Sequence, residues 1–124
     1  MARIVVADDD DDIRELVEFK LTTLGHDVVP CVDGAAALAA CAEHVPDLIL
    51  LDVTMPGMSG LEALAVIRSD SELAELPVVM LTARAQEGDI HAGLSRGATD
   101  YVTKPFSPRE LAARIEELLG TAAP

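Results

Sequence analysis

The 124-residue chain has no tryptophan, and its aromatic residues are limited to two phenylalanines and one tyrosine. A hydrophobic core must therefore be built from aliphatic side chains, which suffice because half of all residues are hydrophobic. Cysteine is scarce as well, and Cys31 and Cys41 are too few to form a disulfide framework. Each lies in an apolar stretch, so we expect both to be buried free thiols.

Positive charge is also in short supply, with 9 lysines and arginines against 22 aspartates and glutamates. The resulting net charge of -13 repels nucleic-acid phosphates and argues against direct binding to DNA or RNA. An acidic surface suits metal ions or basic partner surfaces, although a requirement for solubility explains it equally well.

No apolar stretch approaches 18 residues, so the sequence predicts no segment that spans a membrane. Met1 leads quickly into a short apolar run and then into five aspartates, which is not the pattern of a signal peptide. We therefore expect a cytoplasmic protein. The length predicts one domain over residues 1–120, with residues 121–124 as a tail that is either a frayed end or the start of a linker.

Short apolar runs alternate along the chain with longer amphipathic segments. Within each run the residues are continuously apolar, which is typical of strands buried on both faces. The runs cover 4–7, 28–29, 48–51, 78–81 and 101–102. Helices are expected over 13–24 and 35–42, from Ser59 onward, over about 87–96, and from Ser107 to Gly120. Five strands alternating with five helices predict an α/β domain with a parallel sheet.

The helices carry recognisable start signals. Ser59 and Ser107 each begin a capping box, and Asp33 can cap the second helix. The first helix is expected to bury Ile13, Leu16, Val17, Leu21 and Leu24, and the last Leu111, Ile115, Leu118 and Leu119. The helix over 87–96 contains two glycines, each costing ~1 kcal/mol relative to alanine. It should therefore be the least stable helix.

Polar residues come just after four of the five runs. Asp8 and Asp9 follow the first, Asp52 the third, Thr82 the fourth and Lys104 the last. Because ligands bind beyond the carboxyl ends of the strands in open α/β sheets, these residues mark one candidate site.

Three carboxylates meeting at that site would repel one another, and Lys104 alone supplies too little positive charge. A hard divalent ion such as Mg²⁺ fits, because it accepts a few carboxylates together with water and phosphate oxygens. Asp52 could then attack phosphorus and form an acyl phosphate, with the metal on Asp8 or Asp9 bridging to phosphoryl oxygens. Lys104 and the Thr82 hydroxyl could contact two further phosphoryl oxygens.

Simpler interpretations exist for each residue taken singly. The aspartates from 8 to 12 could be a solvated cluster at a helix N-terminus, and Asp52 could belong to a turn. Thr82 could cap a helix, Lys104 could be a surface lysine, and Tyr101 could be a half-buried strand residue. A coincidental meeting of the first four features (the aspartate run, Asp52, Thr82 and Lys104) at one end of a sheet is much less plausible. For Tyr101, a half-buried strand residue and a ring that changes position with the state of the site are equally plausible. The three histidines, His26, His44 and His91, are expected at the surface.

Four motifs, taken together, resemble the receiver domain of two-component response regulators, the CheY-like family. They are Ile4–Asp10, Leu50–Gly57, Leu81–Ala83 and Asp100–Phe106. The resemblance covers essentially the whole chain. It implies a flavodoxin-like (βα)5 three-layer sandwich whose five-stranded parallel sheet has the order 2-1-3-4-5.

The resemblance also implies roles for individual residues. Asp52 would be phosphorylated by a histidine kinase or phosphotransfer protein, and Lys104 would pair with the phosphoryl group. Mg²⁺ would be held by Asp8, Asp9, Asp52 and the backbone carbonyl of Thr54. Thr82 and Tyr101 would form a switch pair, and the Lys104–Pro105 peptide bond would be cis.

Under this hypothesis the domain is a signalling switch and not an enzyme, although it catalyses its own phosphorylation and dephosphorylation. Its output surface would comprise the fourth helix, fifth strand and fifth helix, read by a downstream protein or by an effector domain missing from this chain. Two rivals are an inactive receiver used as an interaction module and a Mg²⁺-dependent phosphatase. The phosphatase would need a second acid where Thr54 stands.

Overall fold

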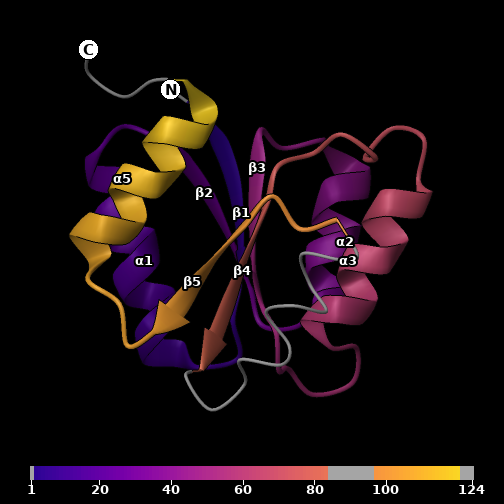
Figure 1. Cartoon of the computed structure of the whole chain (residues 1–124), viewed down its shortest axis with the longest axis horizontal. Helices are drawn as coiled ribbons and strands as arrows, with labels where there is room; N and C mark the ends of the chain where they lie inside the picture. Colours follow the sequence, from indigo (N-terminus) through magenta and orange to yellow (C-terminus); the bar gives the residue numbers. More distant parts are fainter. Residues whose placement is uncertain (1, 84–96, 121–124) are drawn as a thin grey trace.

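The computed structural model describes residues 2–83 and 97–120. Over these ranges five parallel strands form one sheet with the order β2-β1-β3-β4-β5, as predicted (Figure 1). The strands are β1 (Arg3–Ala7), β2 (Asp27–Cys31), β3 (Leu48–Asp52), β4 (Val78–Ala83) and β5 (Asp100–Lys104). Because all pairings are parallel, the carboxyl ends of all five strands lie at one edge of the sheet.

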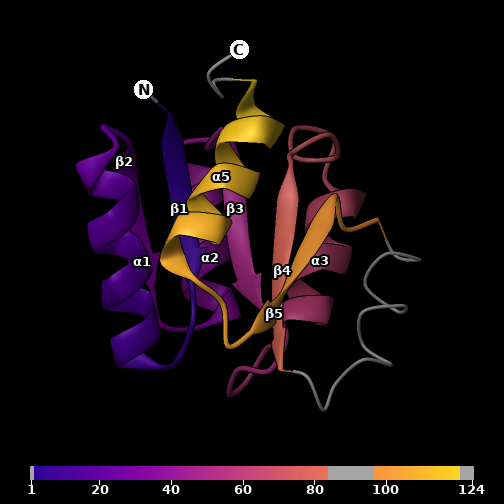
Figure 2. The same cartoon turned by 60° about the vertical axis from the view of Figure 1, so that its left-hand side comes forward.

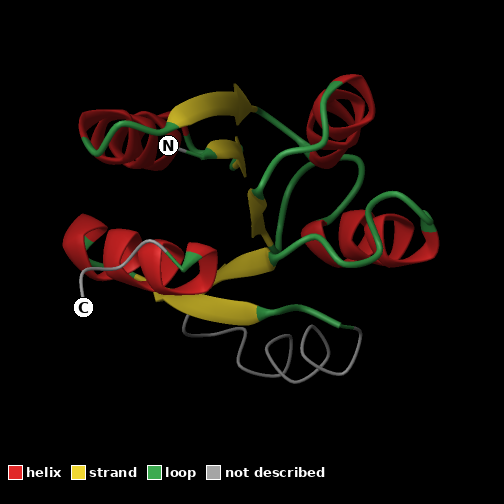
Figure 3. Cartoon of the chain, turned by 90° about the horizontal axis from the view of Figure 1, so that it is seen from above, coloured by secondary structure: helices red, strands yellow, loops and turns green. Residues whose placement is uncertain are grey.

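Among the described residues, two helices cover each face of the sheet. The helices α1 (Asp11–Thr23) and α5 (Pro108–Leu119) lie on one face, and α2 (Gly34–Glu43) and α3 (Gly60–Ser69) lie on the other. Figure 2 shows α5 in front of the sheet with α2 and α3 behind it, and Figure 3 shows the three layers from above. The expected helix over 87–96 lies outside the described residues. None of the helices described is long and apolar enough to cross a lipid bilayer.

The apolar strands contribute side chains to two separate hydrophobic cores. Successive strand residues point to opposite faces, so alternate members of each strand pack under different helices. Val5, Ile49 and Val78 pack with α2 and α3, whereas Ile4, Leu48 and Val79 pack with α1 and α5. This division explains why the central strands β1, β3 and β4 show no polar alternation: both of their faces are covered.

Side-chain caps fix where the helices begin. Asp33 accepts a hydrogen bond from the Ala36 amide at 2.8 Å, and Ser59 and Glu62 form a complete capping box, both as predicted. Ser107 accepts from the two amides that follow its proline. The cap of α1 was not predicted: Asp10 accepts from the amides of Asp12 and Ile13.

Some expectations about burial are wrong. Leu16 and Leu24 are 49% and 44% exposed, because α1 contacts the sheet mainly through the buried Val17 and Leu21. His26 is buried, not at the surface: its Nδ1 accepts the amide N–H of Ala2, and its Nε2 lies 2.5 Å from Glu116 Oε1.

Other burial expectations hold. Cys31 and Cys41 are buried free thiols, as predicted, and burial raises the pKa of both. His44 is exposed as expected, and His91 lies outside the described residues.

Candidate metal and phosphoryl site

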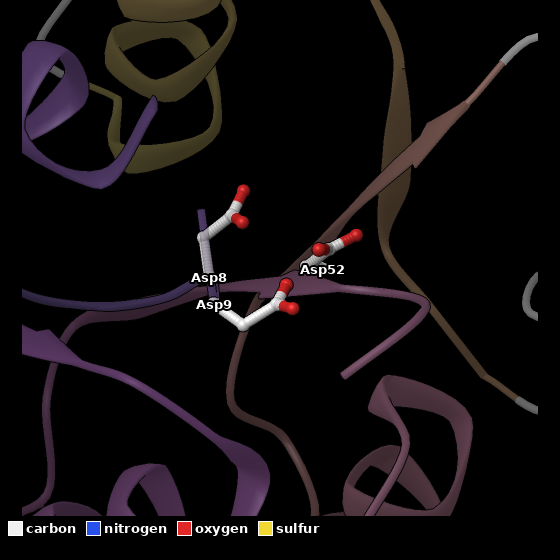
Figure 4. Close-up of side chains that lie close together, drawn as sticks. All are labelled: Asp8, Asp9 and Asp52. Carbon is white, nitrogen blue, oxygen red and sulfur yellow. The ribbon is translucent and has the colours of Figure 1, made fainter. Parts of the chain in front are cut away.

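Three aspartates converge where β1 and β3 end. The register pairs Ala7 with Leu51, so the next residues, Asp8 and Asp52, stand side by side at the carboxyl edge of the sheet. Asp9 follows directly, and Figure 4 shows its carboxylate turned toward that of Asp52. One carboxylate oxygen from each of the three aspartates lies within 4.8 Å of the others. Asp8 and Asp52 are buried, whereas Asp9 is exposed, so the cluster opens to solvent on one side.

Lys104 brings the opposing charge from β5, two strands away from Asp52. Its Nζ lies 3.0 Å from Asp8 Oδ2 and 3.3 Å from Asp52 Oδ2. Burial alone would lower the pKa of Lys104, but its hydrogen bond to Asp8 and the charges of both aspartates raise that pKa overall. Lys104 therefore stays charged and holds two of the three carboxylates.

One lysine does not neutralise the site. Burial and the neighbouring charge of Asp8 raise the pKa of Asp52 to about 7, although Lys104 acts in the opposite direction. A carboxyl group with such a pKa is held in an environment that disfavours its negative charge. The site thus favours either a proton or a further cation near Asp52.

The donor set suits a small divalent ion. An octahedral Mg²⁺ with oxygens at about 2.1 Å places pairs of its ligands roughly 3 to 4 Å apart. The three aspartate oxygens, all within 4.8 Å of one another, need to draw only slightly closer to reach that spacing. Oxygen ligands with net negative charge are also those that a hard cation prefers.

The backbone around Asp52 is tightly constrained. The amide of Val53 donates to Leu81 O at 2.9 Å, and the amide of Gly60, at the start of α3, donates to Val53 O at 2.9 Å. A methyl group at Gly60 would lie 2.1 Å from the carbonyl oxygen of Asp52. Only glycine therefore allows α3 to begin this close to the strand that carries Asp52.

The remaining predicted residues lie near the same edge. Thr82 is fully buried near the end of β4, and its hydroxyl donates weakly to Ala83 O at 3.3 Å. Tyr101 is half-buried on β5 opposite Met80, on the same face of the sheet as Thr82 because strand side chains alternate. Thr54 is exposed two residues beyond Asp52, and the Lys104–Pro105 peptide bond is cis.

Two residues at this edge were missed by the sequence analysis. Gly60 was considered only as part of a capping box, although a glycine directly after a cap residue could have signalled a close backbone approach. Arg14 reaches back from α1 and donates to the carbonyl oxygen of Asp8 at 2.8 Å. Its position four residues after the Asp10 cap places it one helical turn into α1, next to the acidic loop, which runs from Asp8 to Asp11 between β1 and α1.

The family model of the response regulator receiver domain matches residues 4–116. The chain belongs to the response regulator receiver family. Among solved structures, the chemotaxis response regulator CheY4 of Vibrio cholerae superposes with a TM-score of 0.89 at 33% identity, covering 95% of this chain and 98% of that one. The receiver domain of NtrX from Brucella abortus gives 0.88 at 36% identity, covering 96% and 99%.

Two curated relatives are longer than this receiver domain. The phosphate regulon transcriptional regulatory protein PhoB of Klebsiella pneumoniae is 45% identical over 98% of this chain and 53% of its own length. The DNA-binding response regulator MtrA of Mycolicibacterium smegmatis is 45% identical over 94% of this chain and 50% of its own length. The chain thus spans about half the length of these relatives. Membership of the family identifies a signalling domain of two-component systems.

Proposed function

We propose that Asp52 accepts a phosphoryl group from a phosphohistidine of a kinase or phosphotransfer protein. Mg²⁺ would be held by the carboxylates of Asp8, Asp9 and Asp52 and by the backbone carbonyl of Thr54. The observation that carries this proposal is the convergence of three carboxylates within 4.8 Å at the sheet edge of a receiver domain. Lys104 Nζ forms ion pairs with two of them, those of Asp8 and Asp52.

The chemistry requires a carboxylate nucleophile and compensation of the developing negative charge. An oxygen of Asp52 attacks phosphorus, the phosphorus–nitrogen bond breaks with its electrons returning to the imidazole, and an acyl phosphate forms. When bound, Mg²⁺ neutralises charge on the phosphoryl oxygens during transfer. Lys104 Nζ, 3.3 Å from Asp52 Oδ2, is placed to pair with the phosphoryl group that Asp52 acquires.

The domain acts as a switch and not as an enzyme with a separate substrate. Phosphorylation adds roughly 1.5 to 2 negative charges at the sheet edge. The Thr82 hydroxyl makes only a weak hydrogen bond in this structure and can turn toward the phosphoryl group. Tyr101, on the same face of the sheet, then moves into the space that the Thr82 side chain leaves. The surface formed by β5 and α5 changes as a result, and a partner that prefers the changed surface shifts the population.

The partners follow from the same proposal. The phosphoryl donor is a histidine kinase or phosphotransfer protein. The partner that responds to the changed surface is a downstream protein or an effector domain of a longer chain. With a net charge of -13, this domain is itself a poor ligand for DNA. Free thiols at Cys31 and Cys41 fit a reducing cytoplasm.

Incubation with a small phosphodonor and Mg²⁺, followed by intact-mass measurement, tests the acceptor. The wild-type chain should gain one phosphoryl group, and removal of Mg²⁺ with a chelator should abolish the gain. Asp52→Asn should not be labelled, whereas Asp12→Asn, an equal change of charge at an exposed position on α1, should be labelled normally.

Labelling of Asp52→Asn to the wild-type level would show that the acceptor is another residue. Steady turnover of a generic phosphate ester would instead favour the phosphatase interpretation. Complete absence of both labelling and Mg²⁺ binding in the wild type would favour an interaction module.

A further inference from the structure

Arg14 is the only residue of α1 whose side chain, within the described parts of the chain, donates to the backbone of the acidic loop. Its Nη1 donates to Asp8 O at 2.8 Å, and its Nη2 lies 2.5 Å from Asp11 Oδ1. The Arg14 side chain is only 14% exposed, whereas that of Asp11 is 76% exposed. The guanidinium is therefore packed against the loop and is not a freely solvated charge.

The two contacts of Arg14 lie at opposite ends of one short loop. Asp8 stands at the end of β1, and Asp11 is the first residue of α1. The amide of Asp10 donates to Asp8 Oδ1 at 2.9 Å, and this hydrogen bond within the loop further restricts its backbone. Asp9 lies between these fixed points, so the direction of its exposed carboxylate depends on the loop backbone.

The chemistry of the guanidinium suits this bridging. Arginine presents several N–H donors in a planar fork, so one group can hold a carbonyl and a carboxylate in fixed directions at the same time. The ammonium of lysine is a compact point charge and would not keep both contacts in the same geometry. A hydrogen bond from a charged donor is also stronger than one between neutral groups.

We propose that Arg14 is a positioning residue that holds the loop from Asp8 to Asp11 in the conformation that presents Asp8 and Asp9 to a divalent cation. The inference rests on the proposed metal site, and it assigns to a residue outside the ligand set the task of pre-ordering two of its ligands. Outer residues of this kind typically change metal affinity by about 10- to 100-fold when substituted.

A purely electrostatic role for Arg14 predicts the opposite sign. Removing a positive charge beside an acidic site should strengthen the binding of a cation, because repulsion between Arg14 and the metal is lost. A positioning role predicts weaker binding, because the free loop must be ordered when the metal arrives. The sign of the change in affinity therefore separates the two roles.

Isothermal titration of the metal-free chain with MgCl₂ measures this affinity directly. We expect Arg14→Lys and Arg14→Met each to weaken Mg²⁺ binding about 10-fold or more. Lys20→Met, which removes the same charge six residues further along α1, should change the affinity by less than about 2-fold. Because Arg14→Lys keeps the charge, its loss of affinity would mark the lost fork geometry as the cause.

Hydrogen exchange supplies a readout that needs no metal. In the metal-free protein the amide of Asp10, which is bonded to Asp8 Oδ1, should exchange faster in Arg14→Lys than in wild type or Lys20→Met. Circular dichroism establishes whether each variant is folded. If Arg14→Met does not fold, Arg14→Lys alone tests the positioning role.

The outcomes distinguish this inference from the proposed function. Wild-type binding of Mg²⁺ together with unchanged or tighter binding by Arg14→Lys would overturn the positioning role and leave the metal site intact. Failure of the wild type itself to bind Mg²⁺ would overturn both.

Discussion

At the scale of single residues, the site depends on one position that lacks a side chain. Gly60 begins α3, where alanine would ordinarily be favoured by ~1 kcal/mol over glycine. The carbonyl oxygen of Asp52 occupies the place of its missing methyl group, only 2.1 Å from where that carbon would be. The same contact that fixes the start of the helix also fixes the backbone of the proposed phosphoacceptor.

Gly60→Ala should therefore destabilise the fold, against the ordinary preference for alanine in helices. We expect a loss on the order of 1–3 kcal/mol in the free energy of unfolding, because either α3 or the end of β3 must move. Urea unfolding measures the change. Gly25→Ala is a comparison in which the added carbon meets no atom within 4 Å, so its cost comes from backbone strain at a φ of 93° alone. It therefore separates backbone strain from the steric contact present at Gly60.

Phosphorylation of Gly60→Ala by the small phosphodonor should also slow relative to wild type, while Gly25→Ala should be labelled at the wild-type rate. Wild-type stability and labelling rate in Gly60→Ala would mean that the close contact is not important for either property.

A second residue, Asp52, links the charge of the site to stability. Its folded pKa of about 7 lies above the ordinary value of 3.8, because of burial and the charge of Asp8. Between those two values the folded state keeps a proton that the unfolded state has released, so stability falls as the pH rises through this window. Above pH 7 the charge of Asp52 weakens the metal-free fold.

Asp52→Asn should accordingly be more stable than wild type at about pH 8 without metal, by on the order of 1–3 kcal/mol. The difference should shrink as the pH is lowered toward 4, where the wild-type carboxyl is protonated in the folded state. Thermal unfolding in chelator-treated buffer measures both conditions. Asp12→Asn, an exposed carboxylate, should show no such pH-dependent gain, and a gain of equal size there would exclude burial as the cause.

At the scale of elements, contacts between segments distant in sequence close the fold. Arg68 on α3 donates to Leu76 O at 2.7 Å and to Gly97 O at 2.8 Å, and so ties the helix to the segments before β4 and β5. His26, at the turn before β2, joins the start of β1 to α5 through Ala2 and Glu116. Because Nδ1 of His26 accepts a hydrogen bond, the imidazole proton is assigned to Nε2.

His26→Leu should leave the buried amide of Ala2 without its acceptor and remove the link to Glu116. We expect a destabilisation of about 1–3 kcal/mol, measured by urea unfolding at neutral pH. His44→Leu, at an exposed position after α2, is the matched control and should change stability by less than about 0.5 kcal/mol. Equal effects of the two substitutions would refute the structural role of His26.

The elements themselves were largely predictable from sequence, since apolar runs and capping residues are local signals. The strands, the sheet order implied by the family, and the caps at Asp33 and Ser59 are confirmed. The burial of His26 and the exposure of Leu16 were not predictable, because they depend on which distant segment packs against each side chain. Gly60 and Arg14 were missed for a similar reason: each contacts a backbone oxygen, of Asp52 and Asp8 respectively, and the sequence offered at most a weak signal of this in the glycine after the Ser59 cap.

At the scale of the whole molecule, charge and metal binding are connected. A net charge of -13 on 124 residues produces self-repulsion that weakens the compact state and that salt partly screens. A specific cation site adds a separate contribution, because a ligand that binds only the folded state stabilises it by mass action.

MgCl₂ should therefore raise the temperature of unfolding more than NaCl at equal ionic strength. At about ten times the dissociation constant the added stability is ~1.4 kcal/mol, which corresponds to several degrees for a domain of this size. In Asp9→Asn, which loses one exposed carboxylate of the cluster, the two salts should act more nearly alike. Identical effects of the two salts on the wild type would indicate general screening without a specific site.

The division of the sheet into two cores has a consequence for redesign. Leu50 and Leu51 are consecutive in the chain and both fully buried, yet Leu50 packs under α1 and α5 and Leu51 under α2 and α3. Because the two side chains lie in separate clusters, truncations at such consecutive positions should couple less strongly than two truncations within one cluster. The packing beneath α1 and α5 can therefore be rebuilt with new side chains while the opposite half of the interior keeps its original sequence.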